Sequence, residues 1–298
     1  MAQIAEVFRA KSEMRPHRGL VLFGQWWKRA FVFATLLLGA LLMMAPFVWL
    51  ISCSLKTPAQ LWLFPPRLIP DPIAWQNFPK AMTVLPFGRY TLNTLTITAP
   101  VLVGVVLSSS LGGYAFARLN FIGKHLFFMI FLATLMLPGV VTMIPQFVMF
   151  SNMGWVDTFK PLVIPPIMGG GAFNVFLFRQ FFRTIPDELS SAAKIDGCND
   201  FDIYWRIIMP LAKPAITTVA IFTFLATWND FMGPLIYLNS DSKKTIALGL
   251  AGFQGLYATN WELLMAASLV MTLPPLVLFF AAQKYFVEGI VMTGLKGT

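Results

Sequence analysis

Long apolar stretches alternate with short polar segments along this chain of 298 residues. Six stretches are long enough for an α-helix that crosses a hydrocarbon core of roughly 30 Å, which takes about 20 mostly apolar residues. The pattern therefore predicts an all-α, polytopic membrane protein with about six transmembrane helices. Residues 1–29 are expected to precede the membrane domain, which is expected to fill residues 30–298. The expected spans are residues 30–52, 91–117, 125–150, 161–182, 214–238 and 263–283.

Proline and glycine interrupt the third and fourth of these spans. Pro138 and Pro145 fall in the third, and Pro165, Pro166 and the triplet Gly169-Gly170-Gly171 fall in the fourth. Such breaks survive in lipid only where neighbouring helices or a cavity satisfy the freed backbone groups. Two interpretations stay open at this point: kinked helices that line a pathway, and ordinary kinked packing.

The composition leaves too little charge to cover the surface of a soluble domain. Hydrophobic residues make up 57% of the chain and charged residues 12%, against roughly 25% charged residues in a typical soluble domain. We therefore expect much of the apolar surface to face membrane lipid.

Positive charge is distributed unevenly between the two sides of the predicted membrane. With the N-terminus inside, 15 of the 22 Lys and Arg residues fall in inner segments, as the positive-inside rule describes for cytoplasmic loops. Both termini and residues 183–213 are therefore expected in the cytoplasm, and residues 53–90 and 239–261 outside. This bias explains the net charge of +9, and no basic stripe with interleaved aromatic residues points to nucleic acid.

Several other kinds of chemistry lack their usual residue patterns. The two histidines, His17 and His125, are far apart in sequence, so we expect no metal site. Cys53 and Cys198 fall on opposite faces of the predicted membrane and are not expected to pair. No nucleophile and base are paired, and no Gly-x-x-x-x-Gly-Lys-[Ser/Thr] phosphate loop occurs. We therefore expect no catalytic site, no bound ATP and no other cofactor in this chain.

The inner segment 183–213 predicts two short helices joined by a turn. Pro186 and Asp187 favour a helix start, and Gly197 favours the left-handed conformation that ends a helix. Apolar residues then recur at helical spacing, with Asp202 and Arg206 placed for an ion pair four residues apart. The first helix presents small side chains that another protein can approach closely.

The same loop carries a motif of fixed spacing. Ser191-Ala192-Ala193 is followed after three residues by Gly197, and after nine more by Ile207-x-Met209-Pro210. This spacing resembles the EAA signature of bacterial ABC importer permeases, in which Glu-Ala-Ala precedes Gly and Ile-x-Leu-Pro. Ser191 stands where the family has Glu, and Met209 where it has Leu. Glu188, one turn earlier, offers a carboxylate on the same predicted helix.

Further segments are similar to the carbohydrate-uptake branch of that family, so that the resemblance covers residues 30–298. They are residues 185–189, residues 195–197, Trp228-Asn229-Asp230-Phe231, Pro234-Leu235, and a tail with Gln283-Lys284-Tyr285-Phe286 and Gly294-Leu295-Lys296-Gly297.

The resemblance implies a type I ABC importer permease fold in a bacterial cytoplasmic membrane and a transport function without catalysis by this chain. The implied partners are a second homologous permease subunit, two copies of a cytoplasmic ABC ATPase that binds ATP and Mg, and an extracytoplasmic sugar-binding protein. In the family, the EAA loop docks in a cleft of the ATPase. The residues expected to couple to the ATPase are then Glu188, Ser191, Ala192, Ala193, Asp196, Gly197, Ile207 and Pro210.

A few polar residues in the spans are candidates for contact with a substrate. Asp230 is the one carboxylate firmly inside a predicted span, and an intramembrane carboxylate is by default a functional hypothesis. It also lies near the outer edge, where snorkelling or a hydrogen bond with Asn229 explains it equally well. Trp228 suits either a sugar ring or the membrane interface. Asn93 and Asn174 suit either a cavity or a neighbouring helix.

Three classes of function compete at this point. A transport subunit explains both the spans and the two-helix loop. An intramembrane enzyme needs a second titratable group near Asp230, and a receptor-like protein leaves the loop unexplained. Within the transport interpretation, an oligosaccharide, a monosaccharide, a polyol and a glycerophosphodiester-type compound stay open as substrates. Residues 239–261 are either a contact for the binding protein or a Gly-rich connection.

Overall fold

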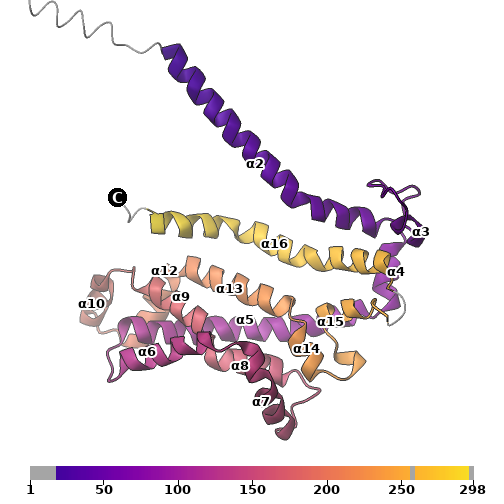
Figure 1. Ribbon diagram of the computed structural model, residues 1–298. Coiled ribbons are helices and arrows are strands. Elements are labelled where there is room, and N and C mark those ends of the chain that lie inside the picture. The colour runs from indigo at the N-terminus through magenta and orange to yellow at the C-terminus, as the bar shows by residue number, and fades with distance from the viewer. Residues whose placement is uncertain (1–17, 256–258, 295–298) are drawn as a thin grey trace, which may run out of the picture.

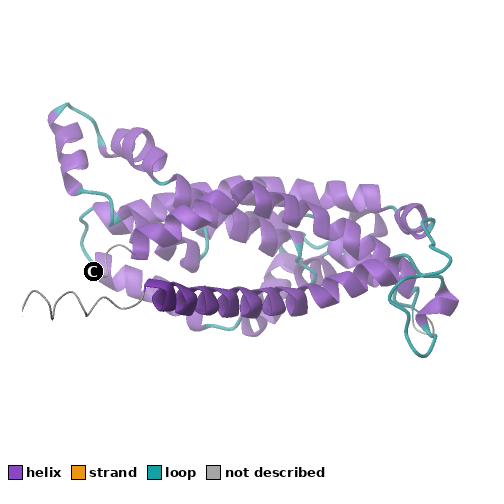
Figure 2. Cartoon of the chain, turned by 90° about the horizontal axis from the view of Figure 1, so that it is seen from above, coloured by secondary structure: helices purple, strands orange, loops and turns teal. Residues whose placement is uncertain are grey.

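The structure, a computed structural model, describes residues 18–255 and 259–294. Figure 2 shows helices and loops and no strands in this described part, as expected of an all-α chain. Residues 1–17 of the expected N-terminal segment and the end of the tail motif lie outside it. The helices are α2 (Arg18–Ser54), α3 (Pro58–Leu61), α4 (Asn77–Val84), α5 (Phe87–Arg118), α6 (Lys124–Ala133), η1 (Thr134–Met136), α7 (Gly139–Asn152), α8 (Lys160–Gly169), α9 (Ala172–Phe182), α10 (Asp187–Ile195), α11 (Asp200–Ile203), η2 (Tyr204–Ile208), α12 (Met209–Leu211), α13 (Lys213–Trp228), α14 (Met232–Tyr237), η3 (Asp241–Lys243), α15 (Ile246–Ala251) and α16 (Trp261–Gly294).

The prediction of about six spans is confirmed, with two corrections. Four helical segments are long and apolar enough to cross a membrane alone, and two bent pairs bring the number to as many as 6. The predicted third span is bent by 97° between η1 and α7, because Pro138 cannot continue the helix. The predicted fifth span, residues 214–238, is not one helix. It ends at Trp228, and α14 follows after a break at residues 229–231.

Chemistry at residues 229–234 explains this break. The Asp230 carboxylate accepts a hydrogen bond from the Gly233 backbone N–H at 3.1 Å, which is a turn that competes with the helix. Pro234 has no backbone N–H to continue the helical ladder. The fourth span is likewise divided, at Gly170 and Gly171, which have φ values of 62° and 78°.

Helix α5 is the centre of the bundle. It packs against α8, α9 and α13, and α16 packs against α2, α4 and α13. Gly113 allows a close approach, because a Cβ there would lie 2.5 Å from the Phe178 Cβ of α9. The N-terminal part of helix α2 runs away from the bundle in Figure 1, and an 18-residue apolar window within Trp27–Ser54 has 0% of its residues buried. Its surface therefore requires an apolar environment.

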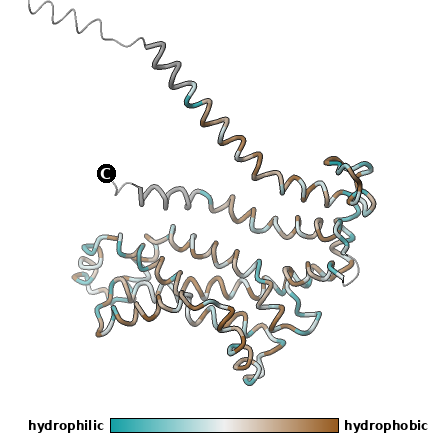
Figure 3. The backbone as a smooth tube through the Cα atoms, viewed as in Figure 1, coloured by the Kyte–Doolittle hydropathy of each residue, from teal (hydrophilic) through white to brown (hydrophobic). Residues whose placement is uncertain are grey.

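The segments expected on opposite sides of the membrane lie at opposite ends of the molecule. In Figure 1, α10 and α12 lie at one end, and α3, α4, α14 and α15 lie at the other. Figure 3 shows hydrophobic residues along the long helices between these ends and hydrophilic ones gathered mainly toward them. The arrangement is that of a membrane domain with two polar ends.

Candidate functional site

The predicted inner loop contains the helix that its sequence indicates. Helix α10 begins at Asp187, has Asp187 and Glu188 in its first turn and is followed by Gly197 with a φ of 85°. The acidic residues suit the positive end of the helix dipole, and the positive φ suits glycine. The predicted pair of Asp202 and Arg206 also forms, with 3.4 Å between Oδ1 and Nε.

The expected ATPase-coupling residues divide between the surface and the core. Ala193 is 5% exposed and belongs to the hydrophobic cluster around α5 and α9, so its side chain supports α10 from below. Ile207 is half-buried against the same cluster. The exposed members, which are available to a partner, are Glu188, Ser191, Ala192, Asp196, Gly197 and Pro210.

A buried arginine joins the loop to α5. Arg118, the last residue of α5, donates a hydrogen bond to the Phe182 carbonyl at 2.7 Å and another to the Ile185 carbonyl, and it forms an ion pair with Asp187. Its side chain is 8% exposed, whereas that of Asp187 is 89% exposed. Arg118 was not predicted from the sequence as part of the loop's support. The sequence feature that could have indicated it is its place as a single arginine directly after the second predicted span, on the same predicted side as the loop.

A second link to α5 lies in an irregular helix. The residues after Gly197 do not form one regular α-helix as predicted, because η2 is a short π-helix. The Tyr204 hydroxyl lies 2.7 Å from the Ser110 hydroxyl of α5, and Tyr204 is buried. Buried hydroxyls need such partners. The loop is therefore attached to α5 at both of its helical parts.

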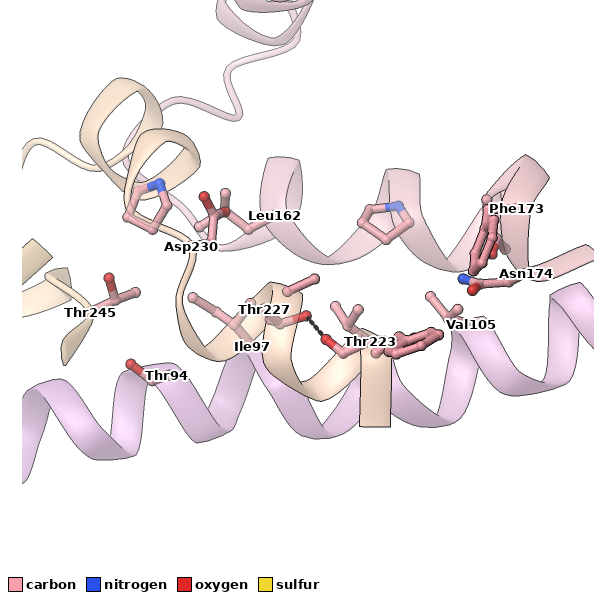
Figure 4. Close-up of a pocket in the computed structure, with 17 residues that line it drawn as sticks. Thr94, Ile97, Val105, Leu162, Phe173, Asn174, Thr223, Thr227, Asp230 and Thr245 are labelled. Atoms are coloured by element: carbon pink, nitrogen blue, oxygen red, sulfur yellow. Dashed lines mark hydrogen bonds between the residues drawn. The ribbon is translucent and has the colours of Figure 1, made fainter. Parts of the chain in front are cut away.

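A cavity of about 450 Å³ lies between α5, α8, α9, α13 and α14. Figure 4 shows Asp230 near Leu162, and Phe173 and Asn174 farther along the cavity. The breaks at residues 170–171 and 229–231 border it, which supports the interpretation that the broken fourth span lines a pathway, whereas none of residues 125–150 of the third span lines it. The lining residues are Thr94, Ile97, Val101, Val105, Leu162, Pro166, Gly170, Gly171, Phe173, Asn174, Phe222, Thr223, Ala226, Thr227, Asp230, Pro234 and Thr245.

Two of the five candidate pathway residues, Asp230 and Asn174, line this cavity. Trp228 is 2% exposed and donates its Nε1–H to the Met271 carbonyl of α16 at 3.1 Å. Asn229 is exposed, and its amide donates to the Leu225 carbonyl at 2.9 Å. Asn93 donates to the backbone carbonyls of Ser242 and Lys244, near the end of the molecule where α15 lies. The structure therefore does not bring these three residues to the cavity.

The segment before α8 and the segment after α14 are joined through Asp157. Its carboxylate accepts hydrogen bonds from the Ser240 hydroxyl at 2.5 Å and the Lys243 ammonium at 2.9 Å, and from the backbone N–H groups of Asn239 and Ser240. These bonds, that from the Ser240 hydroxyl above all, lower the pKa of Asp157 below its usual range. Asp157 has a φ of 58°, a conformation that this network holds in place.

Known proteins that are similar to this chain are permease components of transport systems. Residues 104–291 match the family described as "Binding-protein-dependent transport system inner membrane component". The arabinooligosaccharides transport system permease protein AraQ of Halalkalibacterium halodurans is 36% identical over 205 residues, which are 69% of this chain and 73% of that protein. The sn-glycerol-3-phosphate transport system permease protein UgpE of Yersinia pestis is 33% identical over 265 residues, 86% of this chain and 93% of that protein.

A solved structure has the same fold over nearly the whole chain. It is a bacterial ABC transporter involved in the import of the acidic polysaccharide alginate, with 25% identity and a TM-score of 0.75. The match covers 91% of this chain and 99% of that chain.

Proposed function

Because the chain belongs to the family of binding-protein-dependent transport system inner membrane components, we propose a route by which it couples ATP hydrolysis in a partner to the movement of a substrate. The chain is a permease subunit of an ABC importer for a sugar or a related compound. The proposal also covers the partners of the chain, the residues that couple it to the ATPase and its orientation in the membrane.

The exposed face of α10 is the docking surface for a separate cytoplasmic ATPase that binds ATP and Mg. Glu188, Ser191 and Ala192 are exposed on α10, next to Asp196 and Gly197. Buried Ala193 and Arg118 support this face from within. A surface of small residues on a supported helix suits close contact with another protein. Both termini then lie in the cytoplasm, and residues 53–90 and 239–261 face an extracytoplasmic sugar-binding protein.

Helix α5 is the mechanical link between this surface and the cavity, and it is the observation that carries the proposal. At one end it holds α10 through the ion pair of Arg118 with Asp187, and η2 through the hydroxyls of Ser110 and Tyr204. Along its length it contributes Thr94, Ile97, Val101 and Val105 to the cavity lining. A displacement of α10 when two ATPase subunits close is therefore transmitted along α5, and it changes the cavity between inward-open and outward-open forms. A second homologous permease subunit completes the pathway.

The enzyme alternative lacks a second group for acid–base chemistry. Among the described residues that line the cavity, Asp230 is the one titratable side chain. A catalytic site needs a nucleophile and a base, or an acid and a base, within reach of each other. The cavity therefore supports transport better than intramembrane catalysis.

Identification of the proteins that accompany this chain tests the proposal. The chain is tagged, extracted from its native host in mild detergent and analysed by mass spectrometry. We expect a cytoplasmic ATPase and a second permease of similar length, in a ratio of two ATPase copies to one of each permease. A chain that purifies alone or as a homo-oligomer, under conditions that preserve related complexes, would contradict the heteromeric assembly.

A further inference from the structure

The lining of the cavity carries a negative charge without a balancing cation. Asp230 is its one ionisable residue, and no Lys, Arg or His contributes to the lining in the described part of the chain. The Asp230 carboxylate accepts a backbone N–H from Gly233, and it forms no ion pair among the described residues. An anion in this cavity would face that carboxylate in surroundings of low dielectric constant.

The two lysines that directly precede Thr245 of the lining are already paired, and the exposed Lys160, two residues before Leu162, does not belong to the lining. Lys243 and Lys244 precede Thr245, which lines the cavity. The Lys243 ammonium lies 2.9 Å from Asp157 Oδ2, and the Lys244 ammonium lies 2.6 Å from Asp241 Oδ1. Each positive charge is therefore offset locally and does little to attract an anionic substrate.

Helix dipoles do not reverse this charge. The positive end of the α9 dipole, at Ala172, favours anions. The negative end of the α8 dipole, at Gly169, lies close by in sequence and offsets that effect. The C-terminus of α13 and the N-terminus of α14 meet in the same way around Asp230. What remains is one carboxylate, without a cation among the lining residues.

The neutral polar groups of the lining suit hydroxyl groups of a ligand. Thr223 and Thr245 are 7% and 4% exposed, and their hydroxyl oxygens have no hydrogen-bond partner among the described residues. Asn174 adds an amide whose nitrogen donates to the Gly170 carbonyl at 2.9 Å. The rings of Phe173 and Phe222, 6.2 Å apart, add apolar faces of the kind on which sugar rings pack. A buried hydroxyl without a partner is unfavourable, and a ligand with its own hydroxyls can pair with it.

We propose that this cavity binds neutral polyhydroxylated compounds, such as uncharged sugars and polyols, and excludes phosphate esters and uronates. The inference rests on the proposed transport function and narrows its substrate class. The relatives do not make this choice, because their names include both an arabino-oligosaccharide and sn-glycerol 3-phosphate. Specificity here comes from a repulsive charge as much as from new contacts.

Direct binding to the intact complex, with the binding protein left out, tests this charge selectivity. The probes are radiolabelled arabinotriose, sn-glycerol 3-phosphate and an alginate trisaccharide, each measured by equilibrium dialysis. We expect arabinotriose to bind roughly tenfold or more tightly than either anion. Asp230→Asn keeps an oxygen that can cap Gly233, and it is expected to reduce this preference severalfold. Asp71→Asn, at an exposed aspartate that neither lines the cavity nor forms an ion pair among the described residues, is the matched control and is expected to leave the preference unchanged.

A second variant tests the hydroxyl groups. Thr223→Val replaces a hydroxyl without a partner by a methyl group of similar size, so the folded complex should melt at an unchanged or higher temperature. We expect its affinity for arabinotriose to fall severalfold. An unchanged affinity would show that Thr223 does not contact the ligand and would count against the site.

The outcomes separate this inference from the proposed function. Three results would overturn the neutral-ligand site: tight binding of an anion by the wild type, no binding of any probe, or a preference for arabinotriose that Asp230→Asn leaves unchanged. None of these results would change the subunits found with the chain. Loss of the importer assembly itself would be seen in the co-purification experiment, independently of any ligand.

Discussion

At Gly170, a single residue without a side chain lets α8 and α9 meet α5. Its φ is 62°, and a Cβ added there would lie 2.6 Å from the backbone nitrogen of Ser109. Gly170→Ala is therefore expected to destabilise the protein by about 2 to 4 kcal/mol, from the left-handed conformation and from overpacking against a backbone. The measurement is the melting temperature of the purified complex in detergent. Gly169→Ala is the control, because no atom lies within 4 Å of that added Cβ, and its melting temperature should not fall.

Asp157 predicts a dependence of stability on pH. Its pKa is lowered in the folded protein, so the ionised form contributes stability at neutral pH. This contribution is complete above the ordinary aspartate pKa of about 3.9 and is lost as the pH falls from there through the lower, folded value. We expect Asp157→Asn to lower the melting temperature at pH 7, and we expect the difference from wild type to shrink below about pH 4.

A matched aspartate provides the control for this pH effect. Asp241 also pairs with a lysine, but its side chain is 86% exposed, and exposed pairs contribute little. Asp241→Asn should therefore leave the melting temperature nearly unchanged at each pH. A difference for Asp157→Asn that stays constant from pH 7 to pH 3 would show that its loss acts through packing and not through ionisation.

Some residue roles could be predicted from sequence and others could not. Gly197 could, because a glycine after a helical pattern points to a left-handed helix end, and its φ is 85°. Arg118 could not, because its partners are backbone carbonyls 64 and 67 residues away. Trp228 looked like a pathway residue, yet its indole N–H pairs with Met271, 43 residues later. Long-range pairing of this kind leaves no local pattern.

At the scale of elements, helix lengths were predictable wherever composition alone decides them. The spans of α2, α5 and α16 follow from long apolar runs, which tolerate internal prolines such as Pro46 and Pro100. The fifth span was not predictable as an interrupted helix. The apolar run resumes at Phe231 after only two polar residues, and the turn made by Asp230 and Gly233, together with Pro234, separates α13 from α14. For the third span, the sequence likewise predicted one helix with a kink, and the structure has a sharp bend of 97° before α7.

The α10 helix and the turn after it predict a coupling defect. Gly197 has a φ of 85° and no atom within 4 Å of an added Cβ, so Gly197→Leu strains the backbone and adds bulk to the exposed docking surface. We expect the variant to assemble in the membrane while substrate uptake falls roughly tenfold or more relative to ATP hydrolysis. Uptake and hydrolysis are measured together in proteoliposomes that contain the complete importer.

A substitution at Gly154 is the control that distinguishes the effect of backbone strain from the effect of the position in the docking surface. Gly154 also has a positive φ, 66°, and open space around it, but it lies in the loop after α7. Gly154→Leu should carry a similar conformational cost and keep the normal ratio of uptake to hydrolysis. Normal coupling in Gly197→Leu would remove the docking role assigned to α10, and equal loss in both variants would attribute the defect to strain alone.

At the scale of the whole molecule, the two polar ends fix an axis but not its direction in the membrane. In Figure 1, α10 and α12 of the segment predicted to lie inside are at one end, and α3, α4 and α15, predicted to lie outside, are at the other. The distribution of Lys and Arg supplies the direction, because cytoplasmic loops retain these residues. The sequence could predict this separation because loop charge and span number act over the whole chain and do not depend on any single contact.

Labelling from each side of the membrane tests that direction. Thr83 in α4 and Thr184 before α10 are both exposed and lie at opposite ends. Each is replaced by cysteine after Cys53 and Cys198 have been changed to alanine, since Cys198 lies in the same loop as Thr184. A membrane-impermeant maleimide should label Thr83→Cys in intact spheroplasts and Thr184→Cys only after lysis. The reverse pattern would invert the molecule, place α10 outside the cell and make docking to a cytoplasmic ATPase impossible. The expected pattern puts that surface where ATP is available and leaves α4 and α15 facing the side from which a binding protein delivers its ligand.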